Sequence, residues 1–452
     1  MHAYDKEGAG FQTPPRVLQE AKGIVKAIDV LGRYVKPSMG CTEPIAVALA
    51  AATAKRAIGG EVMRIEIVVD SQIFRNGLAV GVPGAQGQPG THIAAALGAL
   101  GGDPDLGLEV LQTAALEDLE EAQSLLAANQ VSVTMDQQLQ GPHVDAKVHT
   151  THGWGRAVIE GSHTHVSLVE ANGERLHESS ATRTRSDPAH TAGEIGNWLR
   201  GASVSDLISC AEDSDQAALD YARQGIHANQ QAADEGLRQA PGLGAGARLE
   251  QLARSCPRDI GLRAQSLAAA AVDARMAGLR VQVMTSSGSG NQGIVATLPA
   301  ATVARLLDLD ETRLAIAVVL SHLLLARVAE ELGVLTPLCG SAAQAAAAAS
   351  GAIVWLLGGS HPQVEHAASV TLGTQAGILC DGAKPACALK AALGSDVAVK
   401  VALLTMDGMP VGGGSGLVGP SLGETIKDIA LIAADFQNAS QHVLQAIARN
   451  VR

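Results

Sequence analysis

Three cysteines in the second half of the chain have the residue type and the setting of metal ligands. Cys339 stands in PLCGS, and Cys380 and Cys387 stand seven residues apart in CDGAKPAC. On an unbroken helix these two would be separated by about 10 Å of rise, but Gly382 and Pro385 interrupt the segment, so a loop can turn both sulfurs inward. The spacing matches neither a ferredoxin run nor a zinc ribbon. Three such thiols, with a fourth cysteine upstream, suit a [4Fe–4S] cluster with one iron open or loosely held.

The fourth cysteine, Cys41, stands directly before a predicted helix. In the segment GCTEP, Thr42 or Glu43 can cap a helix and Pro44 fits its first turn. The partial positive charge of a helix N-terminus favours a thiolate, which is the form that binds a metal or attacks. A small buried packing residue is the alternative interpretation of Cys41, and the segment by itself does not choose between the two.

A glycine-rich loop at residues 286–293, SSGSGNQG, is a candidate for binding a carboxylate. Successive backbone N–H groups in such a turn form an anion-binding nest, and the side chains of Ser287, Ser289, Asn291 and Gln292 add polar groups. No Gly-Lys-Ser/Thr follows, so the loop is not a P-loop. A flexible turn is the alternative interpretation.

Two arginines and an asparagine are candidate substrate anchors. Arg75 and Asn76 stand in FRNGLAVGVPG, and Arg275 stands in DARMAG. A guanidinium group suits bidentate recognition of a carboxylate, although a surface salt bridge accounts equally well for an isolated arginine.

Five histidines gather in a short part of the chain, namely His143, His149, His152, His163 and His165. Adjacent strands can bring such residues together as a zinc site. Since no cysteine is nearby, we instead expect ordinary surface residues.

The elements that must position these residues change character twice along the chain. Residues 15–60 are predicted to form two helices. From residue 61 a period-two alternation in EVMRIEIVV predicts a strand, and further short strands follow to about residue 180. Beyond that the chain is mostly helical, with a polar, exposed helix predicted at 213–239 and Ala/Leu-rich helices from residue 250.

This order predicts a mainly α-helical catalytic domain with an inserted α+β domain. Residues 1–60 would supply N-terminal helices of the catalytic domain, residues 61–180 would form the insertion, and residues 181–452 would complete the helical domain.

The composition is that of a globular protein, with 47% apolar, 17% charged and only 2% aromatic residues. A net charge of -12 without a long basic run argues against a nucleic-acid or anionic-membrane partner. Residues 341–359 are the one segment expected to reach membrane-span length, and we interpret them as the central helix of a soluble bundle. Since we find no export signal and only six cysteines, we expect a cytoplasmic protein.

Taken together, these segments resemble the iron–sulfur L-cysteine desulfidase family, which is related to the iron–sulfur L-serine dehydratase α domain. The resemblance runs along nearly the whole chain and implies a helical bundle like that domain. It rests on GCTEPIAVALAAA (40–52), RNGLAVGVPG (75–84), DARMAG (273–278), SSGSGNQG (286–293), LCG (338–340) and CDGAKPACALK (380–390).

The resemblance also implies roles for individual residues. Cys339, Cys380 and Cys387 would hold a [4Fe–4S] cluster. Cys41 would be a catalytic thiol or a displaceable fourth ligand, and Glu43 would act beside it in catalysis. Substrate binding is implied for Arg75, Asn76, Arg275, Ser287, Ser289, Asn291, Gln292 and Lys384.

The implied reaction is β-elimination of hydrogen sulfide from L-cysteine, which leaves pyruvate and ammonia. L-Serine or another β-substituted amino or hydroxy acid is the alternative substrate. A non-catalytic iron–sulfur or metal-binding redox sensor is the alternative of another class, but a sensor would not need the polar loop at 286–293. We expect a small-molecule amino-acid substrate and no nucleic-acid or membrane partner, with a homodimer as one assembly to be tested.

Overall fold

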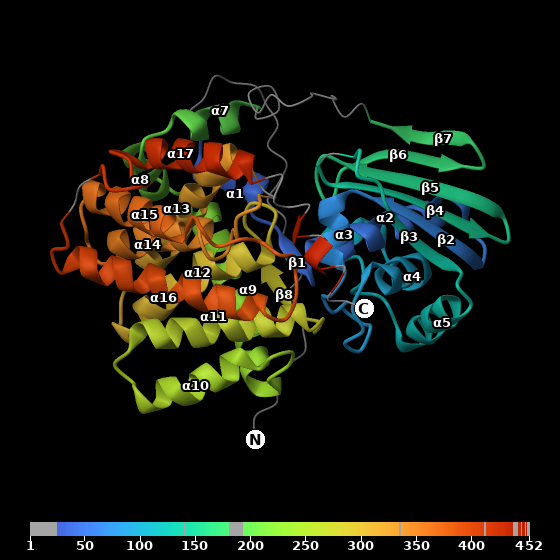
Figure 1. Cartoon of the computed structure of the whole chain (residues 1–452), viewed down its shortest axis with the longest axis horizontal. Coiled ribbons are helices and arrows are strands. Elements are labelled where there is room, and N and C mark those ends of the chain that lie inside the picture. The colour runs from blue at the N-terminus through green and yellow to red at the C-terminus, as the bar shows by residue number, and fades with distance from the viewer. Residues whose placement is uncertain are drawn as a thin grey trace.

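The computed structural model describes residues 25–139, 141–179, 193–333, 336–410 and 413–436, together with 442–443, 445–447 and 449. The N-terminal half of the helix predicted to begin near residue 17 lies outside these residues. Within them, helices dominate and one larger sheet stands to one side (Figure 1).

The larger sheet is mixed and has the strand order β3-β2-β4-β5-β6-β7. β2 and β3 run parallel, whereas the other neighbours are antiparallel. The tight turn between β6 and β7 uses Asn172 and Gly173, whose φ angles of 50° and 91° suit a two-residue hairpin. The strands are β2 (Val62–Val69), β3 (Val131–Met135), β4 (His143–Thr150), β5 (Gly153–Glu160), β6 (Val166–Ala171) and β7 (Glu174–Glu178).

One face of this sheet is covered by α2 (Thr42–Ile58) and α4 (Thr91–Gly101), with α3 (Ser71–Gly77), the short 3-10 helix Pro104–Glu109 and α5 (Leu116–Ala127) nearby (Figure 1). α2 lies so close to β5 that a Cβ on Gly155 would stand 2.0 Å from the carbonyl oxygen of Ala54. Residues 45–54 thus pack in the hydrophobic core of the sheet, although we expected residues 1–60 to pack with the helical part. The reason is that α2 is apolar all round and made largely of alanine, which fits against a sheet as well as against a helix.

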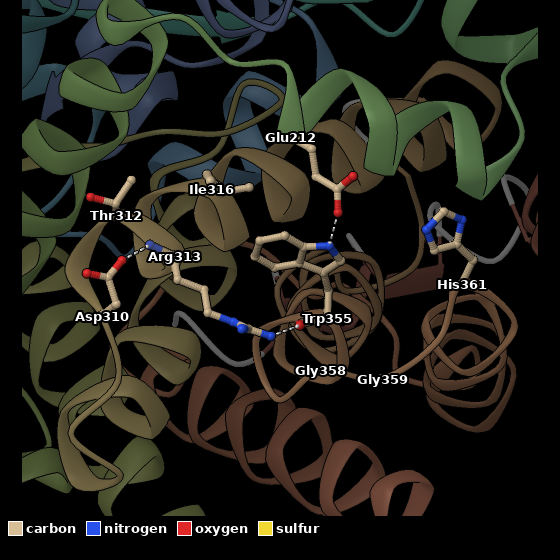
Figure 2. A pocket seen from close by; sticks show the side chains of 9 residues that line it. All are labelled: Glu212, Asp310, Thr312, Arg313, Ile316, Trp355, Gly358, Gly359 and His361. Carbon is tan, nitrogen blue, oxygen red and sulfur yellow. Dashed lines mark hydrogen bonds between the residues drawn. The ribbon is translucent and has the colours of Figure 1, made fainter.

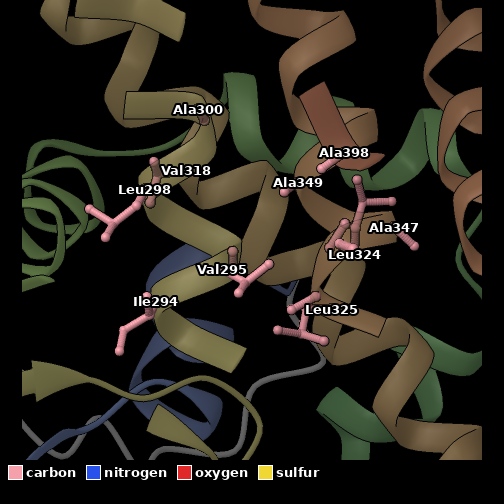
Figure 3. Packing of buried hydrophobic residues seen from close by; sticks show 14 of the residues in the cluster. Ile294, Val295, Leu298, Ala300, Val318, Leu324, Leu325, Ala347, Ala349 and Ala398 are labelled. Carbon is pink, nitrogen blue, oxygen red and sulfur yellow. The ribbon is translucent and has the colours of Figure 1, made fainter. Parts of the chain in front are cut away.

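The remaining helices form a bundle with its own core (Figure 1). Figure 3 shows Ile294 and Val295 of one helix, Val318 and Leu324 of a second, and Ala347 of a third within this core. The helices are α1 (Ala27–Tyr34), α7 (Gly193–Gly201), α8 (Val204–Glu212), α9 (Gln216–Gln239), α10 (Ala245–Ser255), α11 (Ile260–Met276), α12 (Gly290–Leu306), α13 (Glu311–Leu332), α14 (Gln344–Leu356), α15 (His361–Gln375), α16 (Cys387–Met406) and α17 (Leu422–Asp435).

The polar helix predicted at 213–239 is α9, but it is not an exposed helix. One of its faces is made of small residues and is buried against α11, where a Cβ on Gly236 would stand 1.9 Å from the carbonyl oxygen of Ala270. Asn229 on the same helix is fully buried and holds the backbone of residues 284 and 293 by hydrogen bonds of 2.9 and 3.3 Å. The low hydropathy of Ala and Gly concealed this packed face.

Among the described helices, α13 alone is long and apolar enough to cross a membrane. Of its most apolar 18-residue stretch, 78% is buried inside the protein. Our expectation that residues 341–359 are the one segment of that length was wrong. The helix there, α14, has only 13 residues because an irregular turn precedes it.

Candidate active site

Cys41, Glu43 and Asn76 form a buried hydrogen-bonded group at the start of α2. Cys41 is the N-cap residue of this helix. Its Sγ donates to Oε2 of Glu43 at 2.9 Å, and Nδ2 of Asn76 donates to Oε1 of Glu43 at 2.7 Å. Each of the three residues is at most 6% exposed. Asn76 comes from α3, whose N-terminus is capped by the side chain of Asp70.

Burial and charge set the protonation of this group. Burial raises the pKa of the Cys41 thiol well above its ordinary value, and Glu43 raises it further, whereas Arg275 lowers it. Cys41 therefore keeps its proton at neutral pH, which corrects the thiolate expected at a helix N-terminus, because desolvation and the adjacent carboxylate outweigh the helix dipole. For Glu43, burial raises the pKa, but the charge of His163 and the bonds from Cys41 and Asn76 bring it below the ordinary value, so Glu43 is ionised.

A two-stranded sheet brings the segment of Cys41 beside the loop at 286–293. β1 (Pro37–Met39) pairs antiparallel with β8 (Gln282–Met284), with Pro37 opposite Met284 and Met39 opposite Gln282. Beyond the sheet, Oγ1 of Thr42 donates to the carbonyl oxygen of Gly288 at 3.4 Å. Segments nearly 250 residues apart thus meet at this point.

The backbone of this loop is already hydrogen-bonded. Ser286 and Ser289 exchange two backbone hydrogen bonds of 3.0 Å, and the N–H of Ser287 donates to the carbonyl oxygen of Tyr34 at 2.8 Å. The N–H groups of these three residues are therefore already used within the fold, and the predicted nest rests on the remaining N–H groups of the loop. The polar groups left without a partner among the described residues are side-chain atoms, Oγ of Ser287 and Oε1 of Gln292, and both are buried. Oγ of Ser289 caps α12 by accepting from the N–H of Gln292 at 3.4 Å.

Arg275 reaches the same loop from α11. Its Nη1 donates to Oδ1 of Asn291 at 2.9 Å, and its Nε is buried without a hydrogen-bond partner among the described residues. Gly290 makes room for it, since a Cβ there would stand 2.3 Å from that Nε. Arg275 is only 2% exposed and forms no ion pair with a described carboxylate. It is therefore a buried cation with open bonding capacity.

Arg75 is a second buried cation of this kind. It is 4% exposed, its Nε has no hydrogen-bond partner among the described residues, and no described carboxylate pairs with it. It lies against Gly382, where a Cβ would stand 2.9 Å from the backbone oxygen of Arg75 and 3.3 Å from its Cγ. α3, which carries Asn76 as well, thus links the group of Cys41 to the cysteine segment at 380–387.

The three cysteines of the second half come together in the fold. A short antiparallel bridge pairs the backbone around Cys339 with that around Cys380, and both cysteine N–H groups donate across it at 2.7 Å. Cys387 begins α16. Burial, with smaller contributions from the charges of Cys339 and Cys380, raises the pKa of its thiol to about 11. The three sulfurs are therefore near enough for each charge to affect the others.

Cys339, Cys380 and Cys387 are the residues that could hold an iron–sulfur cluster. No three His, Cys, Asp or Glu side chains in the described part of the chain are close enough together to hold one ion. A cluster is larger than an ion, so its ligands stand farther apart, and these thiols would bind iron as thiolates after losing their protons. Gly340, next to Cys339, lies under the amide of Gln292, where a Cβ would stand 2.6 Å from Nε2. The thiols thus border the loop at 286–293.

Lys384 lies between Cys380 and Cys387. It pairs with Asp381, as Lys390 does, and its Nζ donates to the carbonyl oxygen of Gly382 at 3.3 Å. The contacts of Lys384 with described residues thus fall within its own segment, and none of them joins it to the group of Cys41.

His163 is a site residue that the sequence did not indicate. It comes from the turn between β5 and β6, is 7% exposed, and has a buried Nε2 without a partner among the described residues. Its electrostatic neighbours are Glu43, Asp70 and Arg275. Our expectation of a surface residue was therefore wrong for His163. No spacing could have revealed it, because its neighbours are about 100 residues away in the chain, whereas His149 beside Glu66 is partly exposed, as expected.

A separate surface cavity of 590 Å³ lies on the helical bundle between α8, α13, α14 and the start of α15 (Figure 2). Trp355 stands at its centre and donates from Nε1 to Glu212 at 2.9 Å, while Nε of Arg313 donates to the carbonyl oxygen of Leu356 at 2.9 Å. None of the residues singled out from the sequence lines it.

This chain is similar over most of its length to one protein family and to several known proteins. The profile of the family described as "Serine dehydratase alpha chain" matches residues 105–445. A UPF0597 protein of Desulfatibacillum aliphaticivorans is 35% identical over 90% of this chain and 94% of its own length. UPF0597 proteins of Desulforapulum autotrophicum and Kosmotoga olearia are 38% and 34% identical, and cover 90% and 93% of this chain and 93% and 99% of their own.

Proposed function

Because this chain belongs to the serine dehydratase alpha chain family, we propose that it is an iron–sulfur-dependent lyase that eliminates hydrogen sulfide from L-cysteine to give pyruvate and ammonia. The observation that carries the proposal is the hydrogen bond of 2.9 Å between the buried residues Cys41 and Glu43. Arg75 and Arg275, on α3 and α11, are buried and form no ion pair with a described carboxylate. A thiol with a carboxylate proton acceptor, beside anion-binding cations, suits the abstraction of a proton next to a carboxylate.

Cys339, Cys380 and Cys387 are the residues that would hold the cluster. When bound there, an iron with an open position supplies a Lewis acid that assists departure of the β-substituent. The six cysteines are all free thiols, which supports a reducing, cytoplasmic setting for such a site.

The unpartnered polar atoms around Cys41 complement a zwitterion. Arg75 and Arg275 have buried Nε donors without partners, which suit a carboxylate. Asn76 and Gln292 have buried carbonyl oxygens without partners, which suit an ammonium group. Since donors and acceptors both remain open among the described residues, the substrate that fits is an α-amino acid rather than a simple carboxylic acid.

The proton steps follow from the same contacts. The thiol proton of Cys41 must first pass to Oε2 of Glu43, a transfer that the raised pKa of Cys41 opposes and the positive charge of Arg275 favours. Sγ of Cys41 then takes the proton from Cα of the substrate. The electron pair of that C–H bond forms the Cα–Cβ double bond, and the sulfur leaves with the C–S bonding pair. The resulting 2-aminoacrylate hydrolyses in water to pyruvate and ammonia. Burial of Cys41 and Glu43 keeps water from competing for these protons.

L-Serine is the second candidate substrate, because the matched family is described by serine dehydratase. Elimination from serine releases water instead of hydrogen sulfide and uses the same Cα proton. Comparing kcat/KM for L-cysteine and L-serine on anaerobically purified protein decides between them. We expect the value to be higher for L-cysteine, and a higher value for L-serine would replace the proposed substrate.

The test of the cluster and of Cys41 uses separate variants. Cys339→Ala, Cys380→Ala and Cys387→Ala should each lose bound iron and sulfide after anaerobic reconstitution. Cys41→Ser should keep iron and sulfide but lose turnover by about 10²- to 10⁴-fold, because a hydroxyl is a much weaker base. Cys256→Ala is the matched control, since this cysteine is exposed and outside the site. Full iron content in any one of the three Ala variants, or full turnover in Cys41→Ser, would contradict the assigned role.

A further inference from the structure

His163 brings a polar atom from the sheet into the group around Cys41. The turn between β5 and β6 that carries it is held by a backbone hydrogen bond of 3.0 Å from Gly161 to the carbonyl oxygen of Pro142. The imidazole is buried, and its electrostatic neighbours include Glu43 and Arg275, the carboxylate and one of the cations of the site. A buried nitrogen without a hydrogen-bond partner costs free energy, so the absence of a partner for Nε2 among the described residues indicates that a ligand supplies one.

The imidazole is suited to accept a hydrogen bond. Burial lowers the pKa of His163 below its ordinary value, and Arg275 lowers it further, against the opposing charges of Glu43 and Asp70. Burial therefore favours the neutral ring, and in the tautomer that carries its proton on Nδ1 the Nε2 atom is an acceptor. Oδ1 of Asn76 is a second buried acceptor without a partner, on the side chain whose Nδ2 already holds Glu43.

We propose that His163 binds the α-ammonium group of the substrate, with Nε2 of His163 and Oδ1 of Asn76 accepting hydrogen bonds from it beside the negative charge of Glu43. This inference rests on the proposed lyase function and assigns the residues that recognise one end of the substrate. An ammonium group has three donors and a positive charge, which these two acceptors and the carboxylate complement. A 2-hydroxy acid offers one donor and no charge in the same place, so His163 makes the site specific for α-amino acids.

The experiment measures binding without turnover. L-Alanine and L-lactate have the same carbon skeleton, differ in the ammonium and hydroxyl groups, and carry no β-substituent that can leave. Their Kd values are measured by calorimetry on anaerobically purified, iron-loaded wild type, His163→Leu, His163→Gln and His165→Leu. His165 is the matched control, because it lies two residues away and bonds within the hairpin, to the carbonyl oxygen of Glu160 at 3.1 Å and Oγ of Ser179 at 3.2 Å.

We expect wild type to bind L-alanine more tightly than L-lactate. His163→Leu should weaken binding of L-alanine by about tenfold to a hundredfold, the usual effect of losing a hydrogen bond to a charged group, and leave that of L-lactate unchanged. His163→Gln, whose amide oxygen can still accept, should recover part of the affinity for L-alanine, and His165→Leu should behave as wild type.

Three results would overturn the inference. Equal weakening of both ligands in His163→Leu would assign the residue to the fold instead of the ammonium group. Unchanged L-alanine binding in both His163 variants would remove it from the site while leaving the proposed lyase intact. If wild type binds neither compound, the proposed amino-acid site is itself wrong, and this inference falls with it.

Discussion

Arg327 and Arg75 are both buried, but only Arg327 pairs with a described carboxylate. Arg327 is 4% exposed and pairs with Glu331 at 2.6 Å. Arg75 is equally buried, but no described carboxylate pairs with it, and its Nε has no partner. An uncompensated charge in the interior costs several kcal/mol. The fold therefore carries a destabilising group at Arg75, which an anionic ligand would compensate.

Replacing Arg75 should therefore separate stability from function. Arg75→Met, which keeps most of the volume and removes the charge, should raise the melting temperature of the ligand-free protein and abolish turnover. Arg327→Met should lower the melting temperature, because it leaves Glu331 without its partner. Thermal unfolding and turnover of the two variants give the comparison. A lower melting temperature for Arg75→Met without ligand would mean that the guanidinium is stabilised by the fold itself.

At the scale of residues, motifs in the sequence indicated Cys41, Arg75 and Arg275 as functional, and all three are buried. The sequence could not reveal the protonation of Cys41 or the presence of His163. Both depend on burial and on neighbours from other segments. Cys41 keeps its proton because of Glu43 and desolvation. His163 lies in the turn between β5 and β6, far from Cys41 in the sequence.

At the scale of elements, the loop at 286–293 is held in place by the core helix α13. His322 of this helix is 1% exposed, and its Nδ1 lies 3.0 Å from Oγ of Ser286. Burial lowers the pKa of His322 to about 4. This buried neutral imidazole therefore couples the loop of the candidate site to the stability of the bundle.

The coupling has a defined pH dependence. Between pH 6.5 and 4 the unfolded chain binds a proton at His322 that the folded protein does not, so stability falls as the pH drops through this range and is fully present above it. The free energy of unfolding of wild type minus that of His322→Gln should fall by on the order of 3 kcal/mol from pH 7 to pH 4. Other titrating groups cancel in this difference, which denaturant unfolding at several pH values measures. A difference that does not change with pH would show that His322 is not held neutral.

Local sequence patterns predicted the type of most elements but not their surroundings. The period-two pattern of residues 61–69 predicted β2, because such a pattern depends only on nearby residues. The exposure of α9 was predicted wrongly because most residues of its buried face are Ala and Gly, which pack closely without being strongly apolar. The position of α2 against the sheet was also missed, since an apolar helix does not specify its partner.

At the scale of the whole molecule, the candidate site lies where two hydrophobic cores meet. Cys41 belongs to the core of the helical bundle, whereas residues 45–54 of the helix it precedes belong to the core of the sheet.

The two units are joined closely at Gly81 and Gly278. The N–H of Gly81 donates to the carbonyl oxygen of Met276 at 2.9 Å. A Cβ on Gly81 would stand 2.4 Å from the carbonyl carbon of Ala277, and one on Gly278 would stand 2.7 Å from that of Gly81. This contact explains why RNGLAVGVPG and DARMAG, the segments that carry Arg75 and Arg275, both contain glycine.

Adding one methyl group at this junction should disturb the site more than the cores. Gly81→Ala forces a Cβ against backbone atoms that cannot rotate away, so the sheet unit must shift relative to α11, and Arg75 and Asn76 must move with it. We expect turnover to fall by about a hundredfold, because displacing substrate-positioning groups by about 1 Å has that effect. The free energy of unfolding should fall by about 1–3 kcal/mol, as for other overpacked sites. Gly377→Ala is the control, since a Cβ there meets no atom within 4 Å, and it should keep both turnover and stability. Turnover and denaturant unfolding of the two variants are the measurements. If Gly81→Ala loses stability but keeps full turnover, the relative position of the two units does not govern the site.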